Sequence, residues 1–161
     1  MSTYIVFVDD SLGLSVTREV RERCLCLHVQ QAARALGRRF DEALKPVGLT
    51  HGQYSLLISL NRPPPTIGET AQLLAMDRTT LTANLKPLER RGLLTQRSDD
   101  QDKRTRRLHL TDKGRAALKK AVPIWRSTHD QVDPHVRGDM DALKDDLTAL
   151  ALINVDRNAA G

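Results

Sequence analysis

The stretch from Thr66 to Leu110, TIGETAQLLAMDRTTLTANLKPLERRGLLTQRSDDQDKRTRRLHL, decides the fold of this chain. Its first half contains two short helical patterns with a break between them. Thr66 followed by Glu69 is a capping box, in which a hydroxyl and a carboxylate satisfy free N–H groups at a helix start. The apolar side of this first helix is expected to carry Ala71, Leu74 and Ala75.

The second helical pattern begins at Asp77, a residue type that caps helix N-termini well. Leu81, Leu85 and Leu88 follow at helical spacing and predict a buried face. The opposite face is short-chained or basic and consists of Arg78, Thr79, Thr82, Ala83 and Lys86, with Thr80 and Asn84 nearer its edge. Such a face suits a DNA major groove, where base edges offer hydrogen-bond acceptors and thymine methyl groups.

Pro87 removes one backbone hydrogen bond inside this second helix and predicts a kink near Ala83. The kink either bends the helix along a groove or only loosens its last turn. Gly92 ends the helix, because glycine readily adopts the left-handed conformation that follows a helix C-terminus.

After Gly92 the hydrophobic period changes to that of β-strands. Residues 93–97 and 106–110 predict two strands joined by the polar loop 98–105, with Leu94, Leu108 and Leu110 facing inward. Two helices followed by a hairpin with a charged tip are typical of a winged helix-turn-helix.

Positive charge is concentrated on the same stretch. Residues 78–107 contain nine basic and four acidic residues, whereas the whole chain of 161 residues has a net charge of +5. This distribution indicates a polyanionic partner such as nucleic acid. A solvated basic face is the simpler alternative. Only 3% of the residues are aromatic, so the core must consist mainly of aliphatic side chains, which favours helices.

The run from Asp77 to Gly114 resembles the recognition helix and wing of the MarR family of bacterial transcription regulators. The matching segments are residues 88–93 (LERRGL), the wing motif 102–104 (DKR) and residues 110–114 (LTDKG). With the helices on either side, the resemblance covers roughly residues 22–155. It implies a homodimer that binds palindromic DNA and releases it when a small molecule or an oxidant arrives.

The resemblance also assigns roles at the wing tip. The family's wing arginine enters the minor groove and an aspartate braces it, which carries over to Arg104 and Asp102, with Lys103 between them. A guanidinium on a hairpin tip suits a narrow, electronegative minor groove. Asp99 and Asp100 depart from the expected wing and add negative charge close to phosphates, which would weaken binding. A solvated charged loop is the alternative reading.

The flanking segments predict a helical scaffold. Residues 1–17 are expected to form an N-terminal arm, with a β-prone run at 4–8. Residues 18–47 predict one long helix, residues 50–60 a short one that buries Tyr54, Leu57 and Ile58, and residues 112–155 two helices separated at Pro134. The last of these, from about residue 136, carries Met140, Leu143, Leu147 and Leu150 on one face.

The long first helix and the last helix carry more apolar surface than a small winged region can cover. We therefore expect residues 18–47 and 112–155 to form a dimerisation region around the DNA-binding region 48–111, in a twofold homodimer.

Cys26, His51 and Tyr54 are the candidates for an effector or redox site. Cys26 falls where the organic-hydroperoxide-sensing branch of the family carries its reactive cysteine, relative to Gly48-Leu49-Thr50. That branch has tyrosines around the thiol, and the corresponding positions here are Gln30 and Phe40, so packing is the alternative role of Cys26. His51 and Tyr54 lie near the cleft that the resemblance places between the DNA lobe and the dimer base, and packing is again the alternative.

Other chemistry finds little support in the sequence. Cys24 and Cys26 face different ways on a helix, so no disulfide is expected between them. Cys24 and His28 form at most half a metal site, and we expect no metal and no cofactor. Catalytic triads, glycine-rich phosphate loops and paired acidic sites are missing, so we expect no enzyme. Without a membrane-length apolar run or a secretory signal, a cytoplasmic location is expected.

These observations predict a mainly α fold with a small β-wing, a winged helix-turn-helix that forms a homodimer through its N- and C-terminal helices. The expected function is a sequence-specific transcription regulator, a repressor in this interpretation, that binds a palindromic double-stranded DNA operator and is released by a small-molecule effector or an oxidant. The alternative is a winged-helix protein-interaction module that does not bind DNA.

Overall fold

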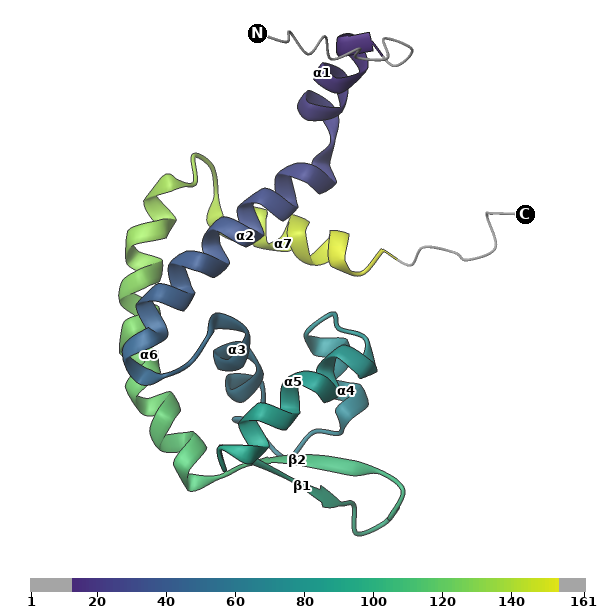
Figure 1. Cartoon of the computed structure of the whole chain (residues 1–161), viewed down its shortest axis with the longest axis vertical. Helices are drawn as coiled ribbons and strands as arrows, with labels where there is room; N and C mark the ends of the chain where they lie inside the picture. The colour runs from purple at the N-terminus through teal and green to yellow at the C-terminus, as the bar shows by residue number, and fades with distance from the viewer. Residues whose placement is uncertain (1–12, 154–161) are drawn as a thin grey trace, which may run out of the picture. The chain divides into compact units, whose positions relative to one another are not determined.

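The computed structural model describes residues 13–153, which are mainly helical with one two-stranded sheet (Figure 1). The elements in chain order are α1 (Gly13–Arg23), α2 (Leu25–Leu44), η2 (Lys45–Val47), α3 (His51–Ser59), α4 (Ile67–Leu73), α5 (Arg78–Arg90), β1 (Leu94–Ser98), β2 (Arg106–Leu110), α6 (Asp112–Val132), η3 (Asp133–His135) and α7 (Met140–Ala151). The chain divides into two compact units between Arg39 and Phe40, inside α2.

The N-terminal unit corrects the prediction of one helix over residues 18–47. Helical structure begins earlier, at Gly13, and is interrupted at Cys24 between α1 and α2. At the interruption the backbone N–H of Leu27 donates to the sulfur of Cys24 over 3.4 Å, a side-chain bond at the start of α2. Residues 13–17, expected in the arm, are therefore helical, and the β-prone run 4–8 lies outside the described residues.

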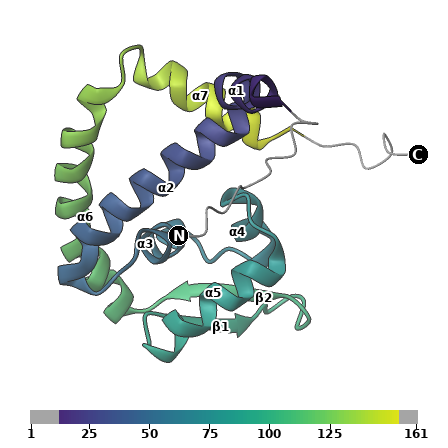
Figure 2. The same cartoon turned by 45° about the horizontal axis from the view of Figure 1, so that its top comes forward.

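Aliphatic side chains build the core of the second unit, as the low aromatic content predicts. Leu81, Leu85 and Leu88 of α5 are fully buried, and so are Leu94 and Leu108 of the hairpin. Figure 1 shows α3, α4 and α5 together on one side of the β1–β2 hairpin, and in the turned view of Figure 2 α5 overlaps the hairpin. Burial of leucines from α3, α5 and the hairpin, together with Ala71 of α4, supplies the main stabilisation of the winged region.

Helix α3 confirms one part of its prediction and corrects another. Thr50 caps it in a reciprocal capping box with Gln53, and Tyr54 and Leu57 are buried. Ile58 is 36% exposed, whereas Leu56 is 1% exposed. The buried arc of the helix is centred between Tyr54 and Leu56, which places Ile58 just beyond its edge.

The two helices of the helix-turn-helix begin as predicted. Thr66 and Glu69 form the expected capping box of α4, and Asp77 accepts the Thr80 backbone N–H at the start of α5 over 2.8 Å. Ala75, expected on the apolar side of α4, instead lies in the turn with a φ of 49° and is exposed. Helix α5 continues through Pro87 to Arg90, and Gly92 follows with a φ of 69°.

The hairpin β1–β2 is antiparallel, with Leu94 paired to Leu110 and Gln96 to Leu108. Its first strand begins one residue later than predicted. The segment before α4 pairs briefly with β2. The backbone N–H of Leu108 donates to the Pro65 carbonyl over 2.8 Å, and Thr66 forms an antiparallel β-bridge with Arg107. Residues 63–65, three consecutive prolines, thereby connect to the wing next to the start of α4.

Thr111 caps α6 by accepting the Gly114 N–H over 3.0 Å. The last helix is shorter than the predicted 136–155, because Val136 is extended and Asp139 provides the N-cap of α7. Residues 154 and 155 lie outside the described range. Within residues 13–153 we find no helix with the length and apolar composition of a membrane span.

Candidate nucleic-acid interface

Helix α5 presents the predicted polar face to solvent. Its predicted contact residues are all exposed, namely Arg78, Thr79, Thr80, Thr82, Ala83 and Lys86. This exposure follows from the burial of Leu81, Leu85 and Leu88, which fixes the rotation of the helix about its axis. The polar face is therefore available to a large ligand without unfolding.

Two of the threonines already make hydrogen bonds within the helix. The Thr80 hydroxyl donates to Asp77 over 2.6 Å, and the Thr82 hydroxyl donates to the Arg78 carbonyl over 2.7 Å. Hydrogen bonds from the Thr80 hydroxyl and backbone lower the pKa of Asp77, so its carboxylate stays ionised at the positive end of α5. Thr80 thus serves the cap, whereas no hydrogen bond within residues 13–153 ties the Thr79 side chain.

The wing tip is closed by Asp102. Its carboxylate accepts the backbone N–H of Arg104 over 3.0 Å and the hydroxyl of Thr105 over 2.9 Å. Asp102 therefore braces the backbone that carries Arg104, which leaves the exposed side chains of Lys103 and Arg104 directed to solvent.

Asp99 was expected to add negative charge close to the DNA phosphates, but its side chain is turned into the wing. Its side chain is only 12% exposed and forms an ion pair with the Nε of Arg107. Arg107 also donates to the Pro64 carbonyl over 2.9 Å. The hydrogen bond from Arg107, helped by the backbone N–H groups of Gln101 and Asp102, lowers the pKa of Asp99. The Asp99 charge is thus neutralised inside the wing.

The structural role of this pair is not visible in the strand pattern. Neighbouring residues of a strand point to opposite faces, so alternation groups Arg106 with the buried Leu108 and Leu110, and Arg107 with His109. Yet Arg106 is exposed and Arg107 is half-buried, because Arg107 pairs with Asp99 and binds the Pro64 carbonyl.

A hollow of about 430 Å³ joins the helix and the wing. Its lining includes Gly68 at the start of α4, Arg78 and Thr82 of α5, and Arg104 and Arg106 of the wing. The hollow brings together three of the predicted residues (Arg78, Thr82 and Arg104) with Arg106 and Gly68, which were not predicted from the sequence. Three guanidinium groups bordering one concave surface favour an anionic ligand.

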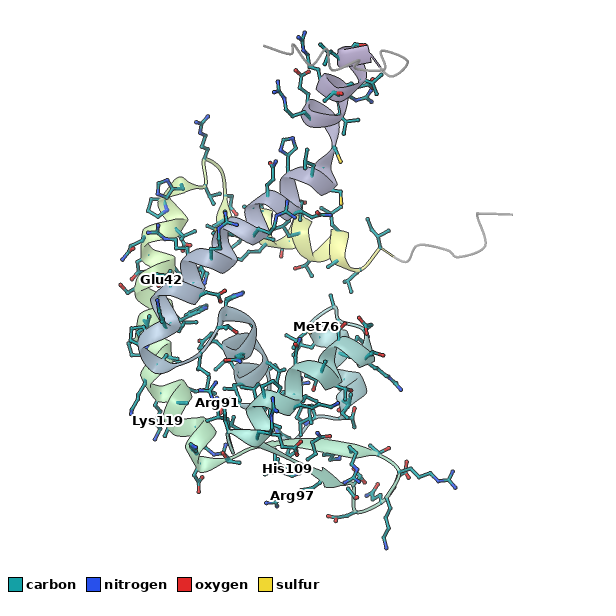
Figure 3. All side chains as sticks on the ribbon, in the orientation of Figure 1. Glu42, Met76, Arg91, Arg97, His109 and Lys119 are labelled. Carbon is teal, nitrogen blue, oxygen red and sulfur yellow. The ribbon has the colours of Figure 1, made fainter. Side chains whose placement is uncertain are left out.

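The end of α5 is tied to the rest of the winged region through Arg91. Its guanidinium donates to the Gly48 carbonyl over 2.8 Å and to the Gln53 side chain over 3.2 Å. The Arg91 carbonyl accepts from Lys113 at the start of α6 over 2.7 Å. Figure 3 labels Arg91 near the end of α5, and Arg97 and His109 along the hairpin. These bonds tie the C-terminal end of α5 to the start of α3 and to the start of α6.

His51 and Tyr54 belong to an aromatic cluster rather than to the face of α5. The Tyr54 ring stacks on Trp125 at 6.1 Å, and His51 lies 5.4 Å from Phe40, centroid to centroid. His129 joins the two pairs, 4.3 Å from Trp125 and 4.8 Å from Phe40. Burial raises the pKa of the Tyr54 phenol.

Cys26 lies in the N-terminal unit and is exposed. Its sulfur accepts a hydrogen bond from the side-chain amide of Gln30 over 3.2 Å. Gln30 thus occupies the neighbourhood where the resemblance expects a tyrosine hydroxyl. Among the described residues no group of three or more histidines, cysteines or acidic residues gathers in a metal-binding arrangement.

Known proteins that resemble this chain in sequence and structure are transcription regulators with a winged helix-turn-helix. A MarR-family sequence profile matches residues 47–105. The organic hydroperoxide resistance transcriptional regulator of Bacillus subtilis is 30% identical over 104 residues, which is 64% of this chain and 71% of that protein. This chain belongs to the MarR family.

Further relatives support the assignment. The HTH-type transcriptional regulator YybA of Bacillus subtilis is 36% identical over 95 residues, 58% of this chain and 61% of its own length. The transcriptional regulator MosR of M. tuberculosis, crystallised in complex with DNA, is 41% identical with a TM-score of 0.74, covering 80% of this chain and 94% of that one. The repressor CouR bound to a 23-mer DNA duplex is 31% identical with a TM-score of 0.71, covering 87% and 96%.

Proposed function

We propose that this MarR-family chain is a transcription regulator that binds a palindromic DNA operator as a homodimer. The observation that carries the proposal is the continuous basic surface formed by the exposed face of α5, the hollow and the wing tip. Membership of a family of transcription regulators, and the DNA complexes of MosR and CouR, support the same ligand.

Each recognition helix would enter a major groove and present Thr79, Thr82, Ala83 and Lys86 to base edges. Arg104 at the wing tip would reach the adjacent minor groove, where a narrow groove attracts a guanidinium. In a homodimer the two helices would lie about 34–36 Å apart, one turn of DNA, and would read the two halves of a palindrome.

Exposed apolar residues support the homodimer. Helix α7 buries none of its residues in the single chain, and Leu143, Leu147 and Leu150 are each 40–41% exposed. Leu25 and Leu36 of α2 are 56% and 42% exposed. A second copy would cover such apolar helix faces and stabilise both chains. The dimerisation region is thus proposed to comprise 18–47 and 112–155, with 48–111 as the DNA-binding region and 1–17 as an arm.

Release by a small molecule or an oxidant is proposed at one of two places. The aromatic cluster of Phe40, His51, Tyr54, Trp125 and His129 offers rings against which a planar ligand would stack. CouR, a relative, has been crystallised with p-coumaroyl-CoA, a ligand with an aromatic group. The second place is the exposed thiol of Cys26, and the hydroperoxide-resistance relative supports it. Repression is the expected sign of regulation.

A salt titration tests the proposed function. Purified protein is mixed with duplexes recovered from random-sequence selection, and affinity is measured between 50 and 200 mM salt. A regulator that contacts about 6–10 phosphates loses roughly 10³–10⁵ in affinity over this range. Arg104→Ala should weaken binding with little change in the preferred core sequence. If no duplex is bound even in dilute buffer, the alternative of a protein-interaction module replaces the proposal.

A further inference from the structure

The guanidinium of Arg78, the first residue of α5, packs against α4 at Gly68, where there is no side chain to displace it. A Cβ atom built on Gly68 would lie 3.2 Å from a terminal guanidinium nitrogen of Arg78, 3.8 Å from its Cζ and 3.9 Å from its Nε. The three nearest atoms to that position all belong to the Arg78 guanidinium. Gly68 therefore leaves the space into which the Arg78 guanidinium folds.

This position directs Arg78 toward the wing. The hollow that Gly68 and Arg78 border also reaches Arg104 and Arg106. Within residues 13–153 no carboxylate lies within ion-pair distance of these three arginines. The charges of the hollow are therefore uncompensated by the protein itself, unlike the charge of the neighbouring Arg107.

DNA geometry identifies what would occupy such a hollow. If α5 lies in a major groove and the wing in the adjacent minor groove, the ridge between them is one sugar–phosphate backbone. The hollow lies between these same two elements, bounded by Thr82 on one side and Arg104 on the other. Arginine binds phosphate oxygens with charge-assisted hydrogen bonds.

We propose that the hollow seats a phosphate of the DNA backbone, that Arg78 and Arg106 bind it, and that Gly68 is the positioning residue for Arg78. This inference rests on the proposed function and deepens it. It assigns Arg78, although it lies on the polar face of α5, to the backbone contacts, where it contributes affinity without sequence information.

The first experiment separates a phosphate contact from a base contact. Arg78→Ala is compared with the full-length parent on a panel of operator variants and at several salt concentrations. Each lost phosphate contact lowers the salt slope by about 0.9, so a dimer should lose about 1.8. Counterion release at about 150 mM salt then corresponds to a roughly 30-fold weaker affinity. The ranking of the operator variants should stay unchanged, and Arg106→Ala should behave alike.

Lys119→Ala is the charge control, because Lys119 is an exposed cation on α6 outside the hollow (Figure 3). It should leave the salt slope within about 0.3 of the parent value, since counterion release requires contact with phosphate.

The second experiment tests Gly68 by a double-mutant cycle. Gly68→Val should weaken DNA binding in the parent by up to the loss seen for Arg78→Ala, and should add nothing to Arg78→Ala. Gly52→Val is the matched control, because Gly52 is also the second residue of a capped helix and a Cβ there would meet nothing within 4 Å. Thermal unfolding of each variant checks the fold.

The outcomes separate the two proposals. A parent that binds no duplex would remove the proposed function itself. If the parent binds DNA but Arg78→Ala changes the ranking of the operator variants, only the proposed phosphate site is overturned. The same holds if Arg78→Ala leaves the affinity unchanged. Equal losses from Gly68→Val with and without Arg78 would show that Gly68 does not act through Arg78, and would equally overturn its positioning role.

Discussion

Gly114, the third residue of α6, packs against the turn that follows α5. Its replacement by alanine should destabilise the protein. A Cβ atom on Gly114 would overlap the carbonyl oxygen of Leu93, and would lie 2.8 Å from Leu110 Cδ1 and 3.1 Å from the Leu93 carbonyl carbon. Carbon atoms in favourable contact are about 3.5–4.0 Å apart. Because the overlapping atom belongs to the backbone, no side-chain rotation relieves the clash.

The magnitude follows from three contributions. Insertion of a methyl group into a packed site costs about 1–3 kcal/mol. The Leu93 carbonyl also accepts the Thr111 N–H over 3.2 Å, and displacing it weakens a bond worth about 1 kcal/mol. Alanine in a helix recovers about 0.5–1 kcal/mol relative to glycine. The net loss is about 1–3.5 kcal/mol in the free energy of unfolding, or roughly 2–14 °C in Tm for a chain of this size.

Calorimetry of Gly114→Ala beside Gly52→Ala measures this loss against a control. Gly52 lies in the first turn of α3 with open space where the methyl group would be, so its alanine variant should unfold at or slightly above the parent temperature. A Gly114→Ala variant as stable as the parent would show that α6 does not pack on the Leu93 carbonyl as described.

Three further results are expected. Leu147→Asp places a charge on the exposed apolar face of α7 and should convert the proposed dimer to a monomer in light scattering, while a dimer of unchanged mass would exclude α7 from the interface. Asp99→Asn should lower Tm near neutral pH. Because Arg107 lowers the pKa of Asp99 below 3.8, the difference from the parent should be full above that pH and vanish as the pH falls through the folded-state pKa. A difference in Tm that stays constant with pH would show that the Asp99–Arg107 ion pair does not stabilise the fold. Cys26→Ser should abolish release from DNA by organic hydroperoxide, and persistent release would assign oxidant sensing elsewhere.

Local sequence signals predicted most of the winged region. The capping box of α4, the Asp77 cap and the glycine after α5 each depend on residues within three or four positions of one another. The leucine spacing of α5 likewise fixed which face is exposed. Interactions this short in sequence form whenever the segment is helical, so the residues alone are sufficient to recognise them.

The errors arose where a longer-range or side-chain interaction competes with periodicity. The predicted long helix is interrupted at Cys24, whose thiol accepts the Leu27 N–H, and the packing of α3 buries Leu56 in place of Ile58. Val136 is extended after η3, which delays α7 until Asp139. A count of apolar residues at helical spacing contains none of this information.

By itself, then, the sequence determined the order of the elements from α3 to α7, the family and the basic face, because periodicity, caps and charge are properties of neighbouring residues. The tertiary structure alone decided the ion pair of Asp99 with Arg107, the folding of Arg78 over Gly68 and the contact of Gly114 with Leu93. Arg107 also binds the Pro64 carbonyl, 43 residues earlier. Residues so far apart in the sequence come into contact only when the leucine core forms, and no local pattern specifies which atoms then meet.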